Sequence, residues 1–420
     1  MKYLPLLFLW IFALSLLQAD EPSNLGISTD PESFSFQIGT GNLGNSLFKL
    51  KPSAPLRIGG FWTFDGDYVF AGGAKGKNVS GNNLLILSAL FDTEKASLWN
   101  NGLVGAEFLQ FNGMPSYEQA GSVQDFDSLT ALSPWNRTEL YQLWIRQAFF
   151  DQKFSIRVGK MIGSIDFNNI QRPLPFVHKS PNIPAISSLL YLPVFLNPIT
   201  LGVMPAYYDP AYGAIMRVAP IPRLYLSAGA FDGNFANKVR TGLTGPHFNG
   251  HYFYIAETGF AWGLDPLEKE GIIALGGWDQ TGKLSIPGSV KEKGAQGIYL
   301  FGSQRLWMRH PGKDFSGVSV FWQLGKNNSK VLPMNDSFGC GCTAFALTGP
   351  QDSFGLGATW SKLNRNIFSR NSELMLQGYY QAHLFFQTFI KPVITFIPTP
   401  GSGKHLPPTW VFSVQVLSLL

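Results

Sequence analysis

Charged residues are scarce in this chain of 420 residues. Asp, Glu, Lys and Arg together make up 14% of it, against about 25% in an ordinary soluble domain. The 32 basic and 27 acidic residues give a formal net charge of +5, and no run of five or more basic residues occurs. No nucleic-acid partner is expected, because binding to a phosphate backbone depends on clustered Lys and Arg side chains.

Long apolar stretches are also missing, with one exception at the start of the chain. Residues 1–19 combine Lys2, an apolar run over 4–17 and the small residue Ala19, which is the pattern of a secretory signal peptide. After residue 19 no stretch of 18 or more uninterrupted apolar residues occurs, so no second helix is long enough to span a bilayer. The proline-containing residues 20–55 are predicted to be a periplasmic lead-in segment rather than a domain.

The chain has only two cysteines, Cys340 and Cys342, which we place in a Gly-rich loop. A local disulfide is one reading of this C-G-C pattern in an exported protein, and a loop feature without a chemical role is the other. Two ligands one residue apart are too few for a metal site. We expect no metal and no other cofactor.

Motifs of catalysis are absent as well. The sequence has no G-x-S-x-G, no G-K-[ST] and no H-E-x-x-H, and its six histidines form no pattern. A barrel enzyme needs a nucleophile with a base within reach, and His383 has no such neighbour in the sequence. The chain is therefore not expected to be an enzyme.

What the sequence does contain is a series of short apolar or alternating segments, rich in the 35 Phe and 45 Gly residues. Alternation with period two indicates strands that have one apolar face. From about residue 56 onward we predict sixteen strands, at 56–70, 83–91, 103–111, 137–150, 154–161, 211–219, 222–231, 251–262, 271–281, 295–308, 316–327, 342–349, 354–363, 372–385, 387–397 and 409–420.

The connections between these segments are of two kinds. Short ones such as 151–153 and 219–222 are predicted to alternate with long ones such as 112–136 and 162–210, from the third strand to the end. Outer-membrane barrels have short periplasmic turns, longer external loops and an even number of strands. The pattern predicts an all-β fold over 56–420, a transmembrane antiparallel β-barrel of 16 strands with both termini in the periplasm.

The faces of single strands favour this fold over a soluble β-sandwich, which also alternates. In 409–420, Trp410 and Phe412 share one face, and Ser413 and Gln415 lie on the other. In 251–262 one face has aromatic residues at both ends and small residues between them. Apolar faces with aromatic ends are typical of strands that meet lipid and its two interfaces.

The opposite faces are predicted to line a lumen. On 137–150 we expect Tyr141, Leu143 and Ile145 to face lipid. Candidate pore-lining and sugar-contact residues are Asp65, Asp67, Glu107, Gln142, Trp144, Arg146, Arg157, Glu257 and Arg305. Carboxylate and guanidinium groups offer directed acceptors and donors to sugar hydroxyls. The alternative is that such side chains only wet the channel and pair with one another.

The longest connection, 162–210, carries eight prolines and the apolar run 186–196. A connection of this length without its own secondary structure is usually functional. Sixteen strands leave a wide aqueous lumen, so we expect this segment to fold into the barrel as a constriction loop. An external lid and an interface to neighbouring barrels are the alternatives.

Several motifs in this order resemble one known family. They are F-D-G-D-Y at 64–68, L-Y-Q-L-W at 140–144, R-V-G-K at 157–160, R-L-W at 305–307, D-S-F-G-L-G at 352–357, and Glu373, Tyr379-Tyr380 and Lys391-Pro392 near the end. Over roughly 56–420 the chain resembles the carbohydrate-selective porins of the OprB family. It departs from them at Leu420, where such barrels usually end in an aromatic residue.

This resemblance implies a bacterial outer-membrane porin through which monosaccharides and disaccharides diffuse passively. It implies the lipid bilayer and the outer-membrane assembly machinery as partners, and a homotrimer as a possible assembly. Two functions remain as alternatives, a non-selective or anion-preferring general porin and a structural or adhesive surface barrel.

Overall fold

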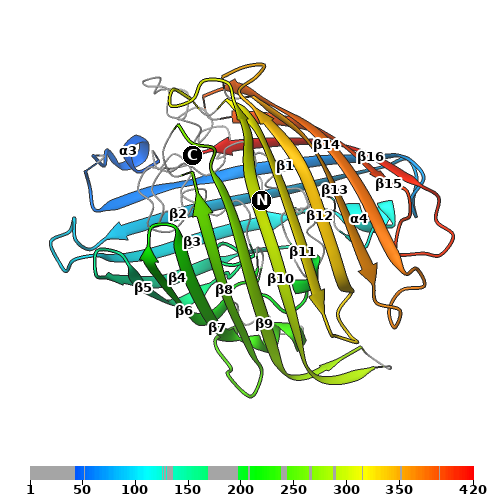
Figure 1. The fold of residues 1–420 in the computed structure, drawn as a ribbon, viewed down its shortest axis with the longest axis horizontal. Coiled ribbons are helices and arrows are strands. Elements are labelled where there is room, and N and C mark those ends of the chain that lie inside the picture. Colours follow the sequence, from blue (N-terminus) through cyan, green and yellow to red (C-terminus); the bar gives the residue numbers. More distant parts are fainter. Residues whose placement is uncertain are drawn as a thin grey trace, which may run out of the picture.

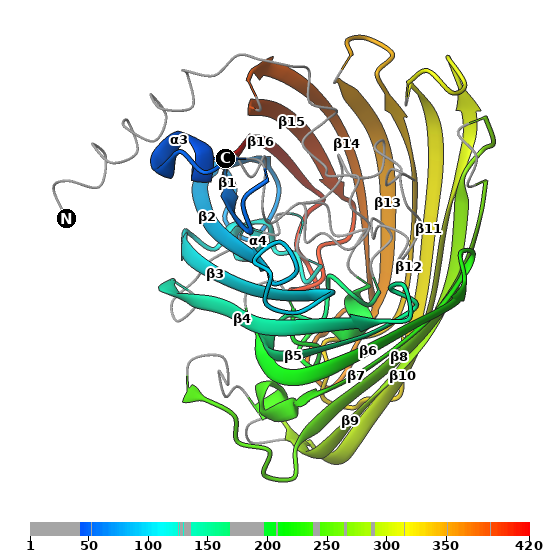
Figure 2. The same ribbon diagram turned by 90° about the vertical axis from the view of Figure 1, so that its left-hand side faces the viewer.

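The computed structural model describes residues 43–420 except 52, 125, 127–128, 130–135, 169–196, 207–208, 238–243, 264–266, 287–289, 315, 351 and 387. The predicted signal peptide and most of the predicted lead-in segment therefore lie outside the described residues. Figure 1 shows long, tilted strands that fill nearly the whole ordered chain. In Figure 2 the same strands form a ring.

The ring is a closed barrel of sixteen antiparallel strands in sequence order. The strands are β1 (Leu56–Ala71), β2 (Asn78–Asp92), β3 (Gly102–Asn112), β4 (Arg137–Phe149), β5 (Phe154–Met161), β6 (Ala211–Ile221), β7 (Leu224–Asp232), β8 (Tyr252–Trp262), β9 (Gly271–Ser285), β10 (Lys291–Met308), β11 (Gly317–Asn327), β12 (Met334–Phe345), β13 (Ser353–Leu363), β14 (Ser372–Phe385), β15 (Thr388–Ile397) and β16 (Thr409–Leu419). Pairing of β1 with β16, from Phe61 opposite Leu419 to Ala71 opposite Trp410, closes the ring. The predicted fold class is confirmed.

Strand β12 is the largest error in the predicted boundaries. It was expected at 342–349 but begins at Met334, because its polar first half pairs with β11 from Asp336, opposite Lys326, onward. Cys340 and Cys342 therefore lie within a strand and not in a loop, and both are free thiols. They are two residues apart on the outward face of β12, opposite Trp322 and Val320 of β11.

The connections follow the predicted alternation in the first half of the barrel and again after β13, where 386–387 is short and 398–408 is long. The three longest, 113–136, 162–210 and 233–251, lie at the same end. In the second half the strict alternation is wrong, since the 286–290 connection is shorter than 263–270 at the opposite end. The reason is that β9 and β10 pair as far as Ser285 opposite Lys291, which turns a predicted loop into strand.

The helices of the described residues are short. They are α3 (Leu43–Phe48), α4 (Ser116–Ala120) and the 3-10 helices η1 (Pro198–Thr200) and η2 (Gly233–Asn237). None in the described part of the chain is long and apolar enough to cross a membrane. Figure 2 shows α3 outside the ring of strands, beside β1, and α4 within it.

Side chains alternate between the two faces of the barrel as expected. On β16 the outward Trp410 and Phe412 are about 40% exposed, whereas the inward Val411 is fully buried. Tyr141 is the exception, since it was predicted to face lipid and is buried. The register between β3 and β4 shifts at this point, from Glu107 opposite Gln142 to Phe108 opposite Leu140. Two consecutive residues of β4, Tyr141 and Gln142, therefore turn inward, as in a β-bulge.

Pro392 lies within β15 at a gap in the sheet. The ladder between β14 and β15 runs to Tyr379 opposite Val393 and resumes at Ala382 opposite Ile390. Proline has no N–H to donate to a neighbouring strand, so the gap places it where one donor fewer is needed. Pairing with β16 continues on the other side, with Pro392 opposite Val414.

Inward-facing glycines make room for aromatic rings on the barrel wall. A Cβ atom on Gly276 would lie 2.2 Å from the Tyr299 ring, and one on Gly105 would lie 2.2 Å from the Trp144 ring. The rings therefore lie flat against the neighbouring strand, an arrangement that fills the space left by glycine in a sheet. The same packing recurs where Gly259 lies against the Tyr225 ring and Gly297 against the Trp278 ring.

We predict that Gly276→Ala destabilises the barrel by about 1–3 kcal/mol, because overpacking forces Tyr299 off the wall. The neighbouring Gly277→Ala is the matched control, since a Cβ there faces outward and meets nothing closer than 3.5 Å. Urea unfolding of both variants in the same lipid vesicles measures the difference. Equal stability of the two would contradict this packing argument.

Candidate pore-lining site

A row of arginines crosses three neighbouring strands on the inward face. Arg146 of β4 lies directly opposite Arg157 of β5, and Arg217 of β6 lies opposite Ser155 of β5. Like charges that face each other across strands repel, so this row needs compensation. Arg146 donates a 3.2 Å hydrogen bond to the Gln152 side chain, which places the row in the half of the barrel nearer the 150–153 turn.

Asp166, in the first residues of the long connection, supplies a counter-charge. Its carboxylate forms an ion pair with Arg157 and a second one, at 3.2 Å, with Arg217. The Arg157 guanidinium also stands 5.3 Å from the centre of the Trp144 ring, within the range of a cation–π contact. Trp144 therefore supports Arg157, and Asp166 ties the loop to the arginine row.

Glu107 and Gln142 form a second contact between the wall and this loop. The Gln142 amide donates a 2.6 Å hydrogen bond to Glu107 and accepts a 3.0 Å bond from the backbone N–H of Ile162. Both side chains are buried. They fix the point at which the chain leaves β5 and turns into the lumen.

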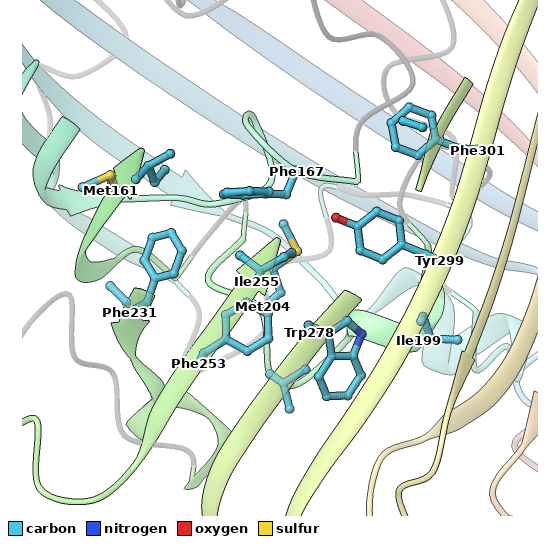
Figure 3. Close-up of a cluster of buried hydrophobic side chains, with 14 of the residues drawn as sticks. Met161, Phe167, Ile199, Met204, Phe231, Phe253, Ile255, Trp278, Tyr299 and Phe301 are labelled. Atoms are coloured by element: carbon cyan, nitrogen blue, oxygen red, sulfur yellow. The ribbon is translucent and has the colours of Figure 1, made fainter. Parts of the chain in front are cut away.

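Glu257 of β8 anchors the loop further along. Its carboxylate accepts hydrogen bonds from the hydroxyls of Tyr225 at 2.8 Å and Tyr299 at 2.9 Å. It also accepts the backbone N–H of Asn168 at 2.7 Å. Figure 3 shows Phe167 among the buried side chains that include Tyr299 and Phe231. Glu257 thus contacts the loop, and it is only 3% exposed.

The far end of the same loop is held by β11 and β12. The Asn197 amide donates to the carbonyl of Leu324 at 2.8 Å and accepts from Ser337 Oγ at 2.6 Å. Ile199 and Val203 are fully buried. Both ends of 162–210 therefore lie inside the barrel, as expected for a constriction loop, and its central part, 169–196, lies outside the described residues.

A second loop, 113–136, also folds inward, which sequence reasoning missed. Its anchor is Glu373 of β14, a fully buried carboxylate. Glu373 accepts hydrogen bonds from Ser122 Oγ at 2.8 Å and from the backbone N–H groups of Val123 at 3.0 Å and Gln124 at 2.7 Å. The N–H of Gly401 adds a fourth at 2.5 Å.

Gln124 extends this contact to β13. Its side-chain carbonyl accepts the hydroxyls of Thr359 at 3.0 Å and Ser361 at 2.8 Å. The loop thus reaches from β3 to a wall about 240 residues later in the chain. A carboxylate predicted to face a water-filled lumen is the only sequence signal for this anchor, and it does not identify the partner.

Asp65 and Asp67 line a different part of the wall, at the seam between β1 and β16. Asp65 accepts a 3.1 Å hydrogen bond from Gln415, and Asp67 accepts a 2.5 Å bond from Ser413. Lys391 of β15 lies opposite Gln415 and 5.8 Å from the centre of the Tyr379 ring. These side chains form a polar row across β15, β16 and β1.

Arg305 stands apart from both rows. It forms a 2.6 Å ion pair with Glu270, in the connection between β8 and β9 at the end opposite the long loops. The structure therefore brings together Glu107, Gln142, Trp144, Arg146 and Arg157 on β3–β5 and adds Arg217, which sequence reasoning missed. It places Asp65 and Asp67, Glu257 and Arg305 in three other environments.

Among the residues whose structure is described, no group of three or more His, Cys, Asp or Glu is placed so that it could hold a metal ion. The polar groups of the lumen are arranged instead as rows of donors and acceptors along the wall. Such rows can bind solutes and ions by hydrogen bonding and charge.

We predict that Glu373→Gln releases the 113–136 loop and raises the single-channel conductance of the barrel. The amide turns an N–H₂ group toward backbone N–H donors, and leaving a buried donor unpaired costs on the order of 1–3 kcal/mol. Planar-bilayer recording and limited proteolysis of the loop are the measurements. Glu94→Gln is the control, because Glu94 accepts the N–H of Asn101 in a turn outside the lumen. Unchanged conductance and unchanged cleavage would show that Glu373 does not position the loop.

Comparison with known proteins extends these observations. Curated proteins give no match. Among solved structures, the chain is similar to Pseudomonas putida OprB at high pH, with a TM-score of 0.73 and 16% identity over 93% of this chain and all of that one. The low-pH structure gives 0.55 at 14% identity, covering 91% and 97% of the two chains.

The outer membrane channel DcaP of Acinetobacter baumannii gives a TM-score of 0.51 at 10% identity, covering 87% of this chain and 97% of that one. At these identities the solved structures show a shared fold. The family is shown by the sequence itself, since the model of the carbohydrate-selective porins matches residues 81–418. The protein belongs to the OprB family of carbohydrate-selective porins, outer-membrane barrels through which carbohydrates diffuse.

Proposed function

We propose that monosaccharides and disaccharides diffuse through this lumen past the arginine row of β4–β6. The observation that carries the proposal is the juxtaposition of Arg146, Arg157 and Arg217 with the anchored start of the long loop. A guanidinium offers several N–H donors in a fixed geometry, which suits the hydroxyl oxygens of a sugar. Glu107, next to the row, supplies an acceptor for sugar O–H groups.

Within this proposal the candidate residues have different roles. Arg146 contacts the sugar, since it lies on the inward face directly opposite Arg157 and its guanidinium donates to the Gln152 side chain. Trp144 holds Arg157 in place, because that guanidinium covers its ring. Glu257 and Glu373 position the two inward loops, and Asp65 and Asp67 line the wall at the seam. Transport is passive, and no chemical step is involved.

The proposed orientation places both termini in the periplasm and the three longest connections outside the cell. Support comes from their shared position at one end of the barrel, as in outer-membrane barrels with short periplasmic turns. The C-terminal strand β16 is then available to the assembly machinery of the outer membrane. Assembly into a homotrimer is an expectation from the family resemblance, which cross-linking in native membranes tests.

An anion-preferring general porin is the second candidate function. The observation that favours it is that the row has three arginines, whereas two carboxylates lie near it among the described residues, Asp166, which pairs with two of the arginines, and Glu107. A pore lined by basic side chains favours anions. The two functions differ in whether neutral sugars bind in the lumen.

We predict that glucose and maltose reduce the single-channel current in a concentration-dependent manner, and that Arg146→Ala weakens this block about tenfold. Losing a hydrogen bond to a charged group costs about 1.5–3 kcal/mol, and each 1.4 kcal/mol is a factor of ten. Arg309→Ala, an exposed site at the periplasmic end in our orientation, is the charge-matched control. A current that no sugar reduces would leave a general porin, and no current at all would favour a structural barrel.

We also predict a preference for anions over cations that falls when Arg217 becomes Gln. Removing this charge leaves the ion pair of Asp166 with Arg157 in place, so the local charge becomes less positive. The reversal potential in a KCl gradient across a planar bilayer measures the change. A preference that stays the same in Arg217→Gln would place the arginine row outside the ion pathway.

A further inference from the structure

We propose that the outer face of β6–β10 binds a lipid whose phosphate-bearing headgroup has a net negative charge, in the leaflet at the end with the long loops. The site has two parts, a group of lysines on the β9–β10 hairpin and an apolar groove below it on β6–β9. The lysines would contact the phosphate, and the groove would hold an acyl chain.

Three lysines lie on the outward face of the hairpin. Lys283 of β9 is directly opposite Lys293 of β10, and Lys291 is opposite Ser285 on the same face. All three are exposed, and the described residues give none of them an ion pair. Their neighbour Glu292 faces the other way, where its carboxylate accepts hydrogen bonds from Ser329 and the N–H of Lys330. Two ammonium groups opposite each other repel, and an anion would relieve this repulsion.

A neighbouring part of the barrel shows how lysines are placed when the protein supplies the counter-charge. At the same end, Asp336 of β12 lies between Lys326 and Lys362, with N–O distances of 3.9 and 3.2 Å. The Lys283–Lys293 pair has the same cross-strand geometry, but among the described residues no acidic side chain pairs with either lysine. The missing anion there must come from the surroundings.

The groove lies nearer the middle of the membrane-facing surface. Its floor is a row of small residues in register across three strands, Ala228, Ala256 and Gly277. Met216 continues this row on β6 and Ile298 on β10, and both side chains are about half exposed or more. The hollow measures about 640 Å³ and is lined almost wholly by apolar atoms.

The two parts are spaced as the headgroup and chain of one lipid would be. Gly277 and Lys283 share the outward face of β9, and six residues at about 3.4 Å each separate them by roughly 20 Å. Tyr252 and Tyr254 stack between the two levels, with ring centroids 6.0 Å apart. Aromatic side chains of this kind mark the membrane–water interface, so the lysines lie at headgroup height and the groove lies in the hydrocarbon.

Asp279 is the one acidic residue on this face of β9, and together with Tyr254 it lines the end of the groove nearer the interface. It lies opposite Tyr254, about 14 Å along the strand from Lys283 at the same rise per residue. It is therefore level with the interface and not with the lysines. A phosphate that binds Lys283 and Lys293 would not contact it.

The test is lipid binding by the full-length barrel, measured by native mass spectrometry from a neutral detergent. The probes are diphosphoryl lipid A, phosphatidylcholine and inorganic phosphate. We expect lipid A to bind at least tenfold more tightly than phosphatidylcholine, and inorganic phosphate alone to bind weakly. Replacing Lys283, Lys291 and Lys293 together with Gln should reduce lipid A binding about tenfold or more, since each basic side chain near a membrane surface adds to the attraction.

Matched variants separate the parts of the site. The double variant Lys326→Gln, Lys362→Gln removes lysines whose charge is already paired, and it should leave lipid A binding unchanged. Ala256→Phe fills the groove and should weaken the binding of lipid A without affecting the binding of inorganic phosphate. Asp279→Asn should not weaken the binding of lipid A.

The outcomes decide between lipid and other occupants. An equal loss of lipid A binding in the triple and the double lysine variant would overturn the proposal, because binding would then depend on the total surface charge and not on this site. Tight binding of inorganic phosphate alone would assign the lysines to a soluble anion. A stable pair of barrels that Ala256→Phe disrupts, with no lipid preference, would assign the groove to a second copy of the chain. All variants remain testable as folded barrels, since the lysines and Ala256 are exposed.

Discussion

Closure of the sheet is the constraint on which the rest of this structure depends. Inside a bilayer no water satisfies backbone N–H and C=O groups, so a sheet can span the membrane only without edges. Here the condition is met by pairing of β1 with β16, and even Pro392 lies where the ladder already has a gap. Once sixteen strands are closed, the lumen is wider than side chains from the wall can fill. The loops must then define the pore.

Buried carboxylates hold these loops. Glu373 gathers four donors from two segments, and Glu257 gathers two tyrosine hydroxyls and one backbone N–H. A carboxylate has no donor of its own and room for several bonds, so it suits a loop whose N–H groups have no strand to pair with. The inward charged residues of this barrel therefore divide into those that build the pore and those that line it.

The sequence predicts the faces of the strands well and the partners of their side chains poorly. Period two places Arg146, Arg157 and Glu257 on the inward face, because alternation is a property of each strand alone. It fails at Tyr141, where the bulge depends on pairing with β3, and at β12, where a polar segment becomes strand only because β11 is beside it. The sequence also could not predict that Glu373 anchors a loop, since its partners Ser122 and Gln124 lie about 250 residues away.

The same limit applies to the outer surface. Alternation identifies Lys283 and Lys293 as exposed residues near a turn, which in most proteins requires no explanation. Only the register of β9 and β10 shows that they face each other, and only the register of β7–β9 shows that Ala228, Ala256 and Gly277 form one row. In a closed barrel the register therefore has consequences on both faces. It determines which charged side chains lie opposite each other in the lumen and which do so on the outer surface. Where the wall itself has no counter-charge, a loop, a solute or a lipid must supply it.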